Sequence, residues 1–312
     1  MEKPTTVYLV RHGMSLHNLF DKYMHKEMAL SQFSESEQKL ITSISSSDRK
    51  FLNDKLLKFD LRLIDPPLAE IGIAQAKAGQ KHVNGMNVKY VFVSPLRRAL
   101  ETSMHLFSAH PHRDSIKFVV VPMIRETISS MNDVPCWSFR DTRKDFEKLP
   151  DLHYDFSMFD GIPDPDLYFL YTLDKEMRDK VLARVSAEGL QNHIQIVLET
   201  MLEKKRVGGK HHNKLETYTN ARLRGMVFAD WLRRFISVKG VKPEEVVVVA
   251  HSSFLCHMTA DEFNEYGRVK TFAKPEFVVP YPFDLRRVPT CGKTEEQLWG
   301  TKILPSLTSE QN

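Results

Sequence analysis

The stretch Thr6-Val7-Tyr8-Leu9-Val10-Arg11-His12-Gly13 decides the fold of this chain. It begins with a nearly continuous apolar run, which is typical of a strand buried on both faces in a parallel α/β sheet. Such sheets bind ligands beyond the carboxyl ends of their strands, where Arg11 and His12 would lie. Gly13 allows a sharp turn and the close approach of a ligand. A histidine at one strand end is usually an ordinary polar residue, so a functional interpretation needs partners from the rest of the chain.

Composition excludes several classes of protein. The 312 residues include 44 Lys and Arg against 40 Asp and Glu, and the net charge of +4 does not predict a nucleic-acid or membrane partner. The three cysteines, Cys136, Cys256 and Cys291, have no CxxC spacing, so neither a disulfide framework nor a zinc site is indicated. We expect a cytoplasmic protein, because no charged-then-apolar leader and no run of membrane-spanning length is present.

Three later strands are predicted at 88–93, 116–121 and 245–250. The first leads into a helix over 95–107, for which Ser94 is the expected cap and Pro95 the first residue, with Arg98 near the helix start. The second runs into Arg125-Glu126, and the third ends at His251. Charged or titratable residues therefore follow each predicted strand.

Helical spacing predicts further helices at 68–81, 181–205 and 213–235. In the first of these, Gly72, Ala76 and Gly79 form a small-residue face that would let the helix lie close to the sheet. Alternating strands and helices predict a three-layer α/β/α sandwich with a mostly parallel central sheet. We expect one domain over 1–312, with helical and loop insertions at about 20–63 and 127–180 and a surface carboxy-terminal extension at about 281–312.

If the strand ends lie side by side, Arg11, His12, Arg98, Glu126 and His251 converge on one crevice. Guanidinium groups bind phosphate oxygens in charge-assisted pairs, and an unprotonated imidazole can attack phosphorus to form a covalent intermediate. Fixed positive groups would stabilise the transferring phosphoryl group, so no metal and no cofactor are required in principle. Glu126 could protonate the leaving alcohol and then accept a proton from water.

The sequence resembles the histidine phosphatase superfamily, the group that includes the cofactor-dependent phosphoglycerate mutases. The matching pieces occur in family order between residues 6 and 255: Arg11-His12-Gly13 with Ser15 and Asn18, Asp65 with Leu68-Ala69-Glu70-Ile71-Gly72 and Gln75-Ala76, Ser94-Pro95-Leu96-Arg97-Arg98-Ala99 with Thr102, Arg125-Glu126, and Val249-Ala250-His251. A single arginine-histidine-glycine triplet is a common pattern, whereas the ordered set is specific.

The resemblance implies a role for each matching residue. His12 would be the phosphorylated nucleophile and Glu126 the proton donor, with Arg11, Arg98 and His251 holding the phosphate. Arg98 is preferred to Arg97 because the family's arginine immediately precedes alanine. The expected substrate-binding set also contains residues that bind phosphate or position the loop: Ser15, Asn18 and Ser252, the last in place of a frequent glycine.

Three functions remain open at this point. The first is a metal-independent phosphomonoesterase that acts through phosphohistidine on a small phosphorylated substrate, and the second is a phosphoglycerate mutase or bisphosphatase. Thr127-Ile128-Ser129-Ser130 differs from the His-Tyr-Gly pattern of the mutases, which weakens the second. The third is a non-catalytic phosphatase-like interaction module. Residues 125–137 are more similar to a poorly characterised eukaryotic branch of phosphoglycerate-mutase-like proteins.

We expect the remaining conspicuous residues to have structural roles and no part in the site. They are Arg97, Glu101, Trp137 and Ser253, the solvated basic loop 204–214 with His211-His212, and Glu276 in an expected late strand over 272–278.

Overall fold

A computed structural model describes residues 5–46, 60–135, 138–149, 152–208, 215–263, 269–271, 273 and 275–307. Its centre is a six-stranded sheet of order β4-β3-β2-β5-β1-β8, in which only the β1–β8 pair is antiparallel. The strands are β1 (Thr6–Arg11), β2 (Tyr90–Val93), β3 (Lys117–Val120), β4 (Tyr154–Asp155), β5 (Val246–Ala250) and β8 (Tyr281–Asp284). A separate pair consists of β6 (Glu262–Phe263) and β7 (Val269–Thr271).

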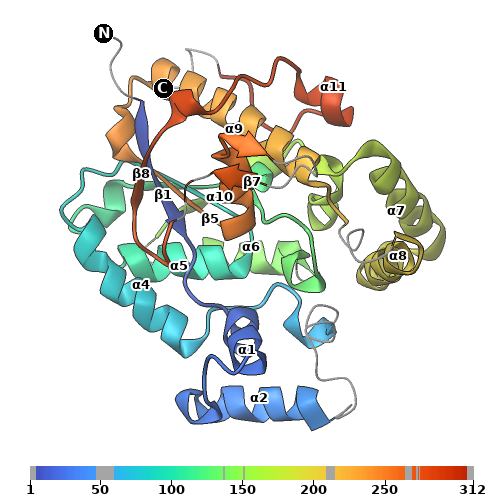
Figure 1. Cartoon of the computed structure of the whole chain (residues 1–312). Coiled ribbons are helices and arrows are strands. Elements are labelled where there is room, and N and C mark those ends of the chain that lie inside the picture. The colour runs from blue at the N-terminus through green and yellow to red at the C-terminus, as the bar shows by residue number, and fades with distance from the viewer. Residues whose placement is uncertain are drawn as a thin grey trace.

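Helices cover both faces of the sheet (Figure 1). They are α1 (Leu16–Met24), α2 (Glu35–Ser46), α4 (Glu70–Val83), α5 (Arg97–Phe107), α6 (Phe139–Glu147), α7 (Lys175–Glu188), α8 (His193–Gly208), α9 (Tyr218–Lys239), α10 (Ser252–Met258) and α11 (Glu295–Trp299). Figure 1 also shows α1 and α2 beyond the end of β1, and α7 and α8 together at another side of the molecule. Among the described residues, no helix is both long and apolar enough to cross a membrane.

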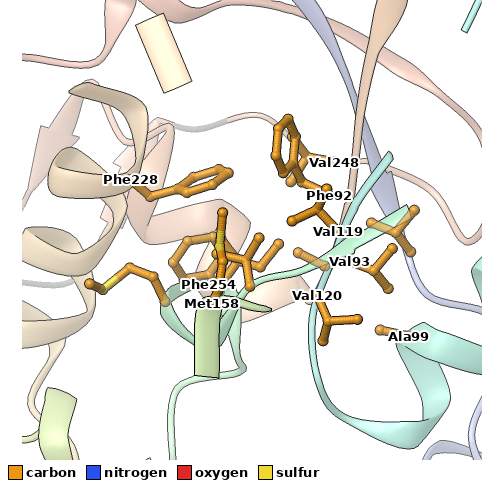
Figure 2. Close-up of a cluster of buried hydrophobic side chains, with 14 of the residues drawn as sticks. Phe92, Val93, Ala99, Val119, Val120, Met158, Phe228, Val248 and Phe254 are labelled. Atoms are coloured by element: carbon orange, nitrogen blue, oxygen red, sulfur yellow. The ribbon is translucent and has the colours of Figure 1, made fainter. Parts of the chain in front are cut away.

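Successive residues of β2 face opposite helical layers, as the strand period requires. Phe92 packs edge-on against Phe228 of α9, with ring centroids 6.3 Å apart, and Val93 lies on the side of Ala99 of α5 (Figure 2). β5 is buried at every residue, as expected for a strand in the middle of a parallel sheet. The predicted three-layer α/β/α architecture with a mostly parallel sheet is therefore confirmed.

Two segments expected outside the sheet contribute strands to it. Within the predicted insertion 127–180, Tyr154–Asp155 form β4 and pair parallel with β3. Within the predicted surface extension 281–312, Tyr281–Asp284 form β8 and pair antiparallel with β1. These strands have two and four residues, too short for the alternation of polar and apolar residues to reveal them.

Several predicted boundaries are wrong. α5 begins at Arg97 rather than at Pro95, because the backbone of Ser94 continues the β2–β5 ladder and its hydroxyl contacts His251. The helix expected over 181–205 is two helices, interrupted at Gly189 with a φ of 95°. No strand is assigned to the described part of 272–278, where Phe277 makes only an isolated bridge with Arg11. His211-His212 and Trp137 lie outside the described residues.

The small-residue face of α4 is buried, but Gly72 packs against the loop after β1 rather than against the sheet. A Cβ atom at Gly72 would lie 2.0 Å from the carbonyl oxygen of Met14, and one at Gly13 would lie 2.8 Å from the carbonyl oxygen of Gly72. Only glycine therefore allows α4 and this loop to approach so closely.

Candidate active site

The register of the central strands brings the two histidines together. Arg11 at the end of β1 pairs with Ala250 at the end of β5, so His12 and His251 leave adjacent strands at the same level. The backbone N–H of His12 donates to the Ala250 carbonyl at 3.0 Å, and the centroids of the two imidazole rings lie 5.0 Å apart. The convergence expected from the strand ends is thus present in the fold.

The hydrogen bonds of His12 define its tautomer. Nδ1 lies 2.6 Å from the carbonyl oxygen of Gly13, which can only accept, so Nδ1 carries the proton. Nε2 is then unprotonated, and its lone pair accepts a hydrogen bond from the Nε–H of Arg98 at 3.3 Å. Burial and the charge of Arg98 hold the pKa of His12 well below its ordinary value of 6.5. This shift favours the neutral ring, which is the form that acts as a nucleophile.

The loop after His12 is fixed by side chains from two helices. The Gly13 N–H donates to the hydroxyl of Thr102, which in turn donates to the carbonyl of Arg98. The Met14 N–H donates to Oε1 of Gln75. Gln75 and Thr102 were part of the sequence motifs without an assigned role, and the structure places both as supports of the His12 loop.

A cavity of about 170 Å³ opens in front of His12. Its lining residues are Arg11, His12, Ser15, His17, Asn18, Arg98, Glu126, Ser129, Ser130, Asn132, Asp133, Ser252 and Ser253. Pockets for drug-sized ligands are larger, roughly 300–1,000 Å³. The cavity is therefore suited to a phosphoryl group and a small part of the alcohol attached to it.

Arg98 is held from two sides. Nη1 donates to the carbonyl of Asn132 at 2.8 Å, and Nη2 donates to Oδ1 of Asp133 at 3.1 Å. The side chain of Arg98 is only 5% exposed, so this orientation is enforced by packing as well as by hydrogen bonds. Arg97 does not line the cavity, and its backbone N–H donates to Asp65 instead.

Arg11 has a different environment. Its guanidinium carbon lies 3.8 Å from the centre of the Phe277 ring, a cation–π contact, and its Nε is buried without a hydrogen-bond partner among the described residues. The backbone fixes this arrangement, because the Val278 N–H donates to the Arg11 carbonyl at 2.9 Å. Arg11 thus brings to the cavity a guanidinium group whose Nε has no hydrogen-bond partner among the described residues.

Glu126 also lines the cavity, and its carboxylate accepts hydrogen bonds from backbone N–H groups. Oε1 accepts the N–H groups of Thr127 at 2.7 Å and Phe254 at 2.8 Å, and Oε2 accepts that of Ser253 at 3.1 Å. Burial, followed by the negative charge of Asp133, raises the pKa of Glu126 above its ordinary value. A carboxyl group with a raised pKa can donate a proton at a pH where an exposed carboxyl would be ionised.

The other predicted residues occupy different positions around the cavity. Ser15 and Asn18 line it but also form the capping box of α1, in which the Asn18 backbone N–H donates to Ser15 Oγ and the Ser15 backbone N–H donates to Asn18 Oδ1, each at 3.3 Å. Ser252 lines it at the start of α10. His251 does not line it and is fully buried, with Nε2 2.6 Å from the Ser94 hydroxyl and Nδ1 without a hydrogen-bond partner in the described structure.

A buried ion cluster supports the segment that carries Glu126. Glu216 accepts from Arg125 Nη1 at 2.6 Å and from Arg224 Nε at 2.6 Å, and all three side chains are completely buried. Arg224 also donates to the carbonyl groups of Met123 and Arg125. Arg125, which follows a predicted strand end, is therefore part of the support of the site and not of the cavity wall.

The sequence analysis missed most of one cavity wall. Asn132, Asp133, Ser129 and Ser130 were not assigned to the site, and Ser253 received a structural interpretation, yet all of them line the cavity. Their segment was noticed only as part of a looser resemblance. No periodic pattern marks irregular backbone of this kind, so composition and spacing contain no indication of where it folds.

Part of this chain is similar to known proteins. Residues 61–151 match the family model described as histidine phosphatase superfamily (branch 1). A curated relative, fructose-2,6-bisphosphatase TIGAR B of Danio rerio, is 29% identical over 86 residues, which are 28% of this chain and 33% of the relative. The match thus spans about a third of the length of that protein.

Similar solved structures include two with little sequence identity. One is an ecdysone phosphate phosphatase from Bombix mori, with a TM-score of 0.44, 14% identity and coverage of 89% of this chain and 88% of that one. Another is a phosphoglycerate mutase from Bacillus anthracis str. Sterne, with a TM-score of 0.40, 13% identity and coverage of 92% and 96%.

The fold and the site define an α/β protein with a histidine at the carboxyl edge of a parallel sheet. The family model is more particular: over residues 61–151 this chain is similar to the histidine phosphatase superfamily (branch 1), as the motifs also indicate.

Proposed function

We propose that this protein is a phosphomonoesterase that hydrolyses a small phosphate ester through a phosphohistidine at His12, without a metal ion. The observation that carries the proposal is the unprotonated Nε2 of His12, which results from the hydrogen bond between Nδ1 and the Gly13 carbonyl. This nitrogen lies beside Arg98 in a cavity also lined by Arg11 and Glu126.

In the first step, the Nε2 lone pair of His12 forms a bond to phosphorus while the bond from phosphorus to the alcohol oxygen breaks. Glu126 gives its proton to the departing oxygen, and Arg11 and Arg98 stabilise the charge on the equatorial phosphoryl oxygens. In the second step, water gives a proton to Glu126 and attacks phosphorus, and the electron pair of the N–P bond returns to Nε2. Glu126 and His12 are then restored.

His251 supplies a further donor in this proposal. The Ser94 hydroxyl accepts the Leu96 N–H and can donate its own proton to Nε2 of His251. In that arrangement Nδ1 of His251 carries the ring proton. That buried N–H has no partner in the described structure, and a phosphoryl oxygen bound to His12 would provide one.

The test is turnover of an aryl phosphate by the purified chain, with and without a chelator, compared with His12→Ala. We expect wild-type turnover that survives the chelator, an acid-labile phosphoenzyme, and loss of both in the variant. His82→Ala, a change at an exposed position of α4, is the matched control and should retain activity. Activity that requires added metal, or that persists in His12→Ala, would contradict the proposal.

The natural substrate is sought with a panel of phosphorylated metabolites. Since the curated relative is named a bisphosphatase, the panel includes fructose 2,6-bisphosphate and bisphosphoglycerate.

A further inference from the structure

We propose that Asp133 is a specificity-determining residue, which makes this site select phosphate esters of uncharged or cationic alcohols and reject those whose alcohol carries a carboxylate or a second phosphate. The inference rests on the proposed phosphatase function and concerns the same cavity. Its evidence is the position of Asp133, the charge balance of the cavity and the direction in which an alcohol must leave.

Asp133 is fixed in the cavity wall by four hydrogen bonds. Oδ1 accepts from Nη2 of Arg98 at 3.1 Å. Oδ2 accepts from the Ser129 N–H at 3.2 Å and from the hydroxyls of Ser129 and Ser130, each at 3.1 Å. A carboxylate with so many donors, only 11% exposed in its side chain, cannot turn away from an incoming anion. Its carboxyl group is therefore a fixed feature of the wall.

The charges of the lining do not exceed those of one phosphoryl group. Among the described lining residues, Arg11 and Arg98 carry positive charge, Glu126 and Asp133 are the acidic side chains, and His17 is the imidazole besides the nucleophile. With Glu126 protonated for catalysis, the two arginines face one carboxylate, an excess of one positive charge. A dianionic phosphoryl group already exceeds that balance. A second anionic group on the substrate would enter a region with no further arginine or lysine in the described lining, and like charges at close range are strongly unfavourable.

In-line transfer decides which wall the alcohol meets. The leaving oxygen departs on the side opposite His12 Nε2, and it must come within reach of Glu126 to receive a proton. Glu126 begins the segment that continues through Ser129 and Ser130 to Asp133, all of which line the same cavity. The alcohol therefore passes Asp133. The two serine hydroxyls beside it offer hydrogen bonds to an uncharged alcohol.

Two substrates with the same carbon skeleton test the inference. Glycerol 3-phosphate and 3-phosphoglycerate differ in one group, a hydroxymethyl in the first and a carboxylate in the second. We expect kcat/KM of the wild type to favour glycerol 3-phosphate at least about tenfold. Asp133→Asn should reduce this ratio about tenfold, mainly by improving turnover of 3-phosphoglycerate. Asp141→Asn removes one negative charge from an exposed ion pair of α6 and should leave the ratio unchanged.

The outcomes separate this inference from the proposed function. A wild type that prefers 3-phosphoglycerate, or an unchanged ratio in a folded Asp133→Asn, overturns the inference while phosphatase activity stands. Failure of the wild type to turn over these esters and an aryl phosphate overturns the proposed function and this inference with it. If Asp133→Asn does not fold, the wild-type ratio alone decides. As the pH rises, the variant should lose activity at a lower pH than the wild type does. Loss of the Asp133 charge lowers the pKa of Glu126, so Glu126 gives up its proton earlier in the titration.

Discussion

At the scale of single residues, the site depends on two groups whose pKa values move in opposite directions from their ordinary values. Burial and Arg98 lower the pKa of His12, which favours the unprotonated form of the nucleophile. Burial and Asp133 raise the pKa of Glu126, which favours the protonated form of the acid. The two side chains share one cavity but have different neighbours, so one small site can hold a base and an acid in their reactive forms.

The pH dependence of kcat/KM should show both shifts. Activity is lost at low pH as His12 gains a proton, and this limb should lie below the ordinary histidine value of 6.5. Activity is lost at high pH as Glu126 loses its proton, and this limb should lie above the ordinary carboxyl value of 4.5. Rates measured from pH 4 to pH 9 with an alkyl phosphate check the prediction.

Glu126→Gln removes the proton donor and supplies the control for this profile. We expect turnover of an alkyl phosphate to fall by about 10²–10⁴, the usual range for general acid catalysis. Turnover of an aryl phosphate should fall less, because its leaving group departs without protonation. Equal losses with both substrates would show that Glu126 acts on binding or folding and not as the acid.

At the scale of elements, the distance between α4 and the loop after β1 sets the position of His12. Gly72 and Gly13 allow the close approach, and Gln75 of α4 accepts the Met14 N–H. α5 contributes Thr102 to the same loop through the Gly13 N–H. Two helices thus determine where the nucleophile lies, although neither carries it.

Gly72→Ala should therefore damage both stability and activity. The added Cβ would lie 2.0 Å from the Met14 carbonyl oxygen, so the loop or the helix must move. We expect a loss of about 1–3 kcal/mol in the free energy of unfolding, with a lower kcat for the fraction that remains folded. Urea unfolding and aryl phosphate turnover measure the two effects. Gly85→Ala, at a position with open space around it, should change neither.

At the scale of the whole molecule, the Glu216 cluster joins distant parts of the chain behind the site. Arg125 follows β3 and also donates to Thr172 in the insertion. Glu216 lies just before α9, and Arg224 lies within α9. Asn220 donates to Glu216 and accepts from the indole of Trp299 in α11. The insertion, α9 and the carboxy-terminal segment are thereby linked to the segment of Glu126.

Glu216→Gln should destabilise the protein by about 3–5 kcal/mol, because it leaves two buried arginines without their counter-charge. Burial alone would raise the pKa of Glu216, but Arg125 and Arg224 outweigh it and lower that pKa to about 2. A lowered pKa stabilises the fold above the unfolded value of about 4.5, and this contribution is lost as the pH falls from there towards 2.

Urea unfolding at pH 7 and at pH 3.5 tests this prediction. The difference between wild type and Glu216→Gln should be smaller at pH 3.5 than at pH 7. Glu188→Gln, which removes an exposed partner of Arg184, is the control and should have no measurable effect at either pH. An equal difference at both values would show that the charge of Glu216 is not responsible.

Much of the fold could be predicted because its central elements are long and regular. The buried runs of β1 and β5 and the helical spacing of α5 and α9 are local patterns. The predictions failed where an element is short or interrupted. β4 and β8 form because they find an open sheet edge to pair with, and Gly189 divides one helical pattern into two helices.

The sequence by itself determined the central strands β1, β2, β3 and β5 and placed His12, Arg98, Glu126 and His251 after strands, because a buried strand must end where its apolar run ends. Only the tertiary structure decided that Asp133 accepts a hydrogen bond from Arg98 and that Phe277 makes a cation–π contact with Arg11. The same is true of the ion pair by which Glu216 supports the segment of Glu126. These contacts join residues far apart in the chain through irregular backbone. Such pairing depends on how whole elements pack together, and no local pattern encodes it.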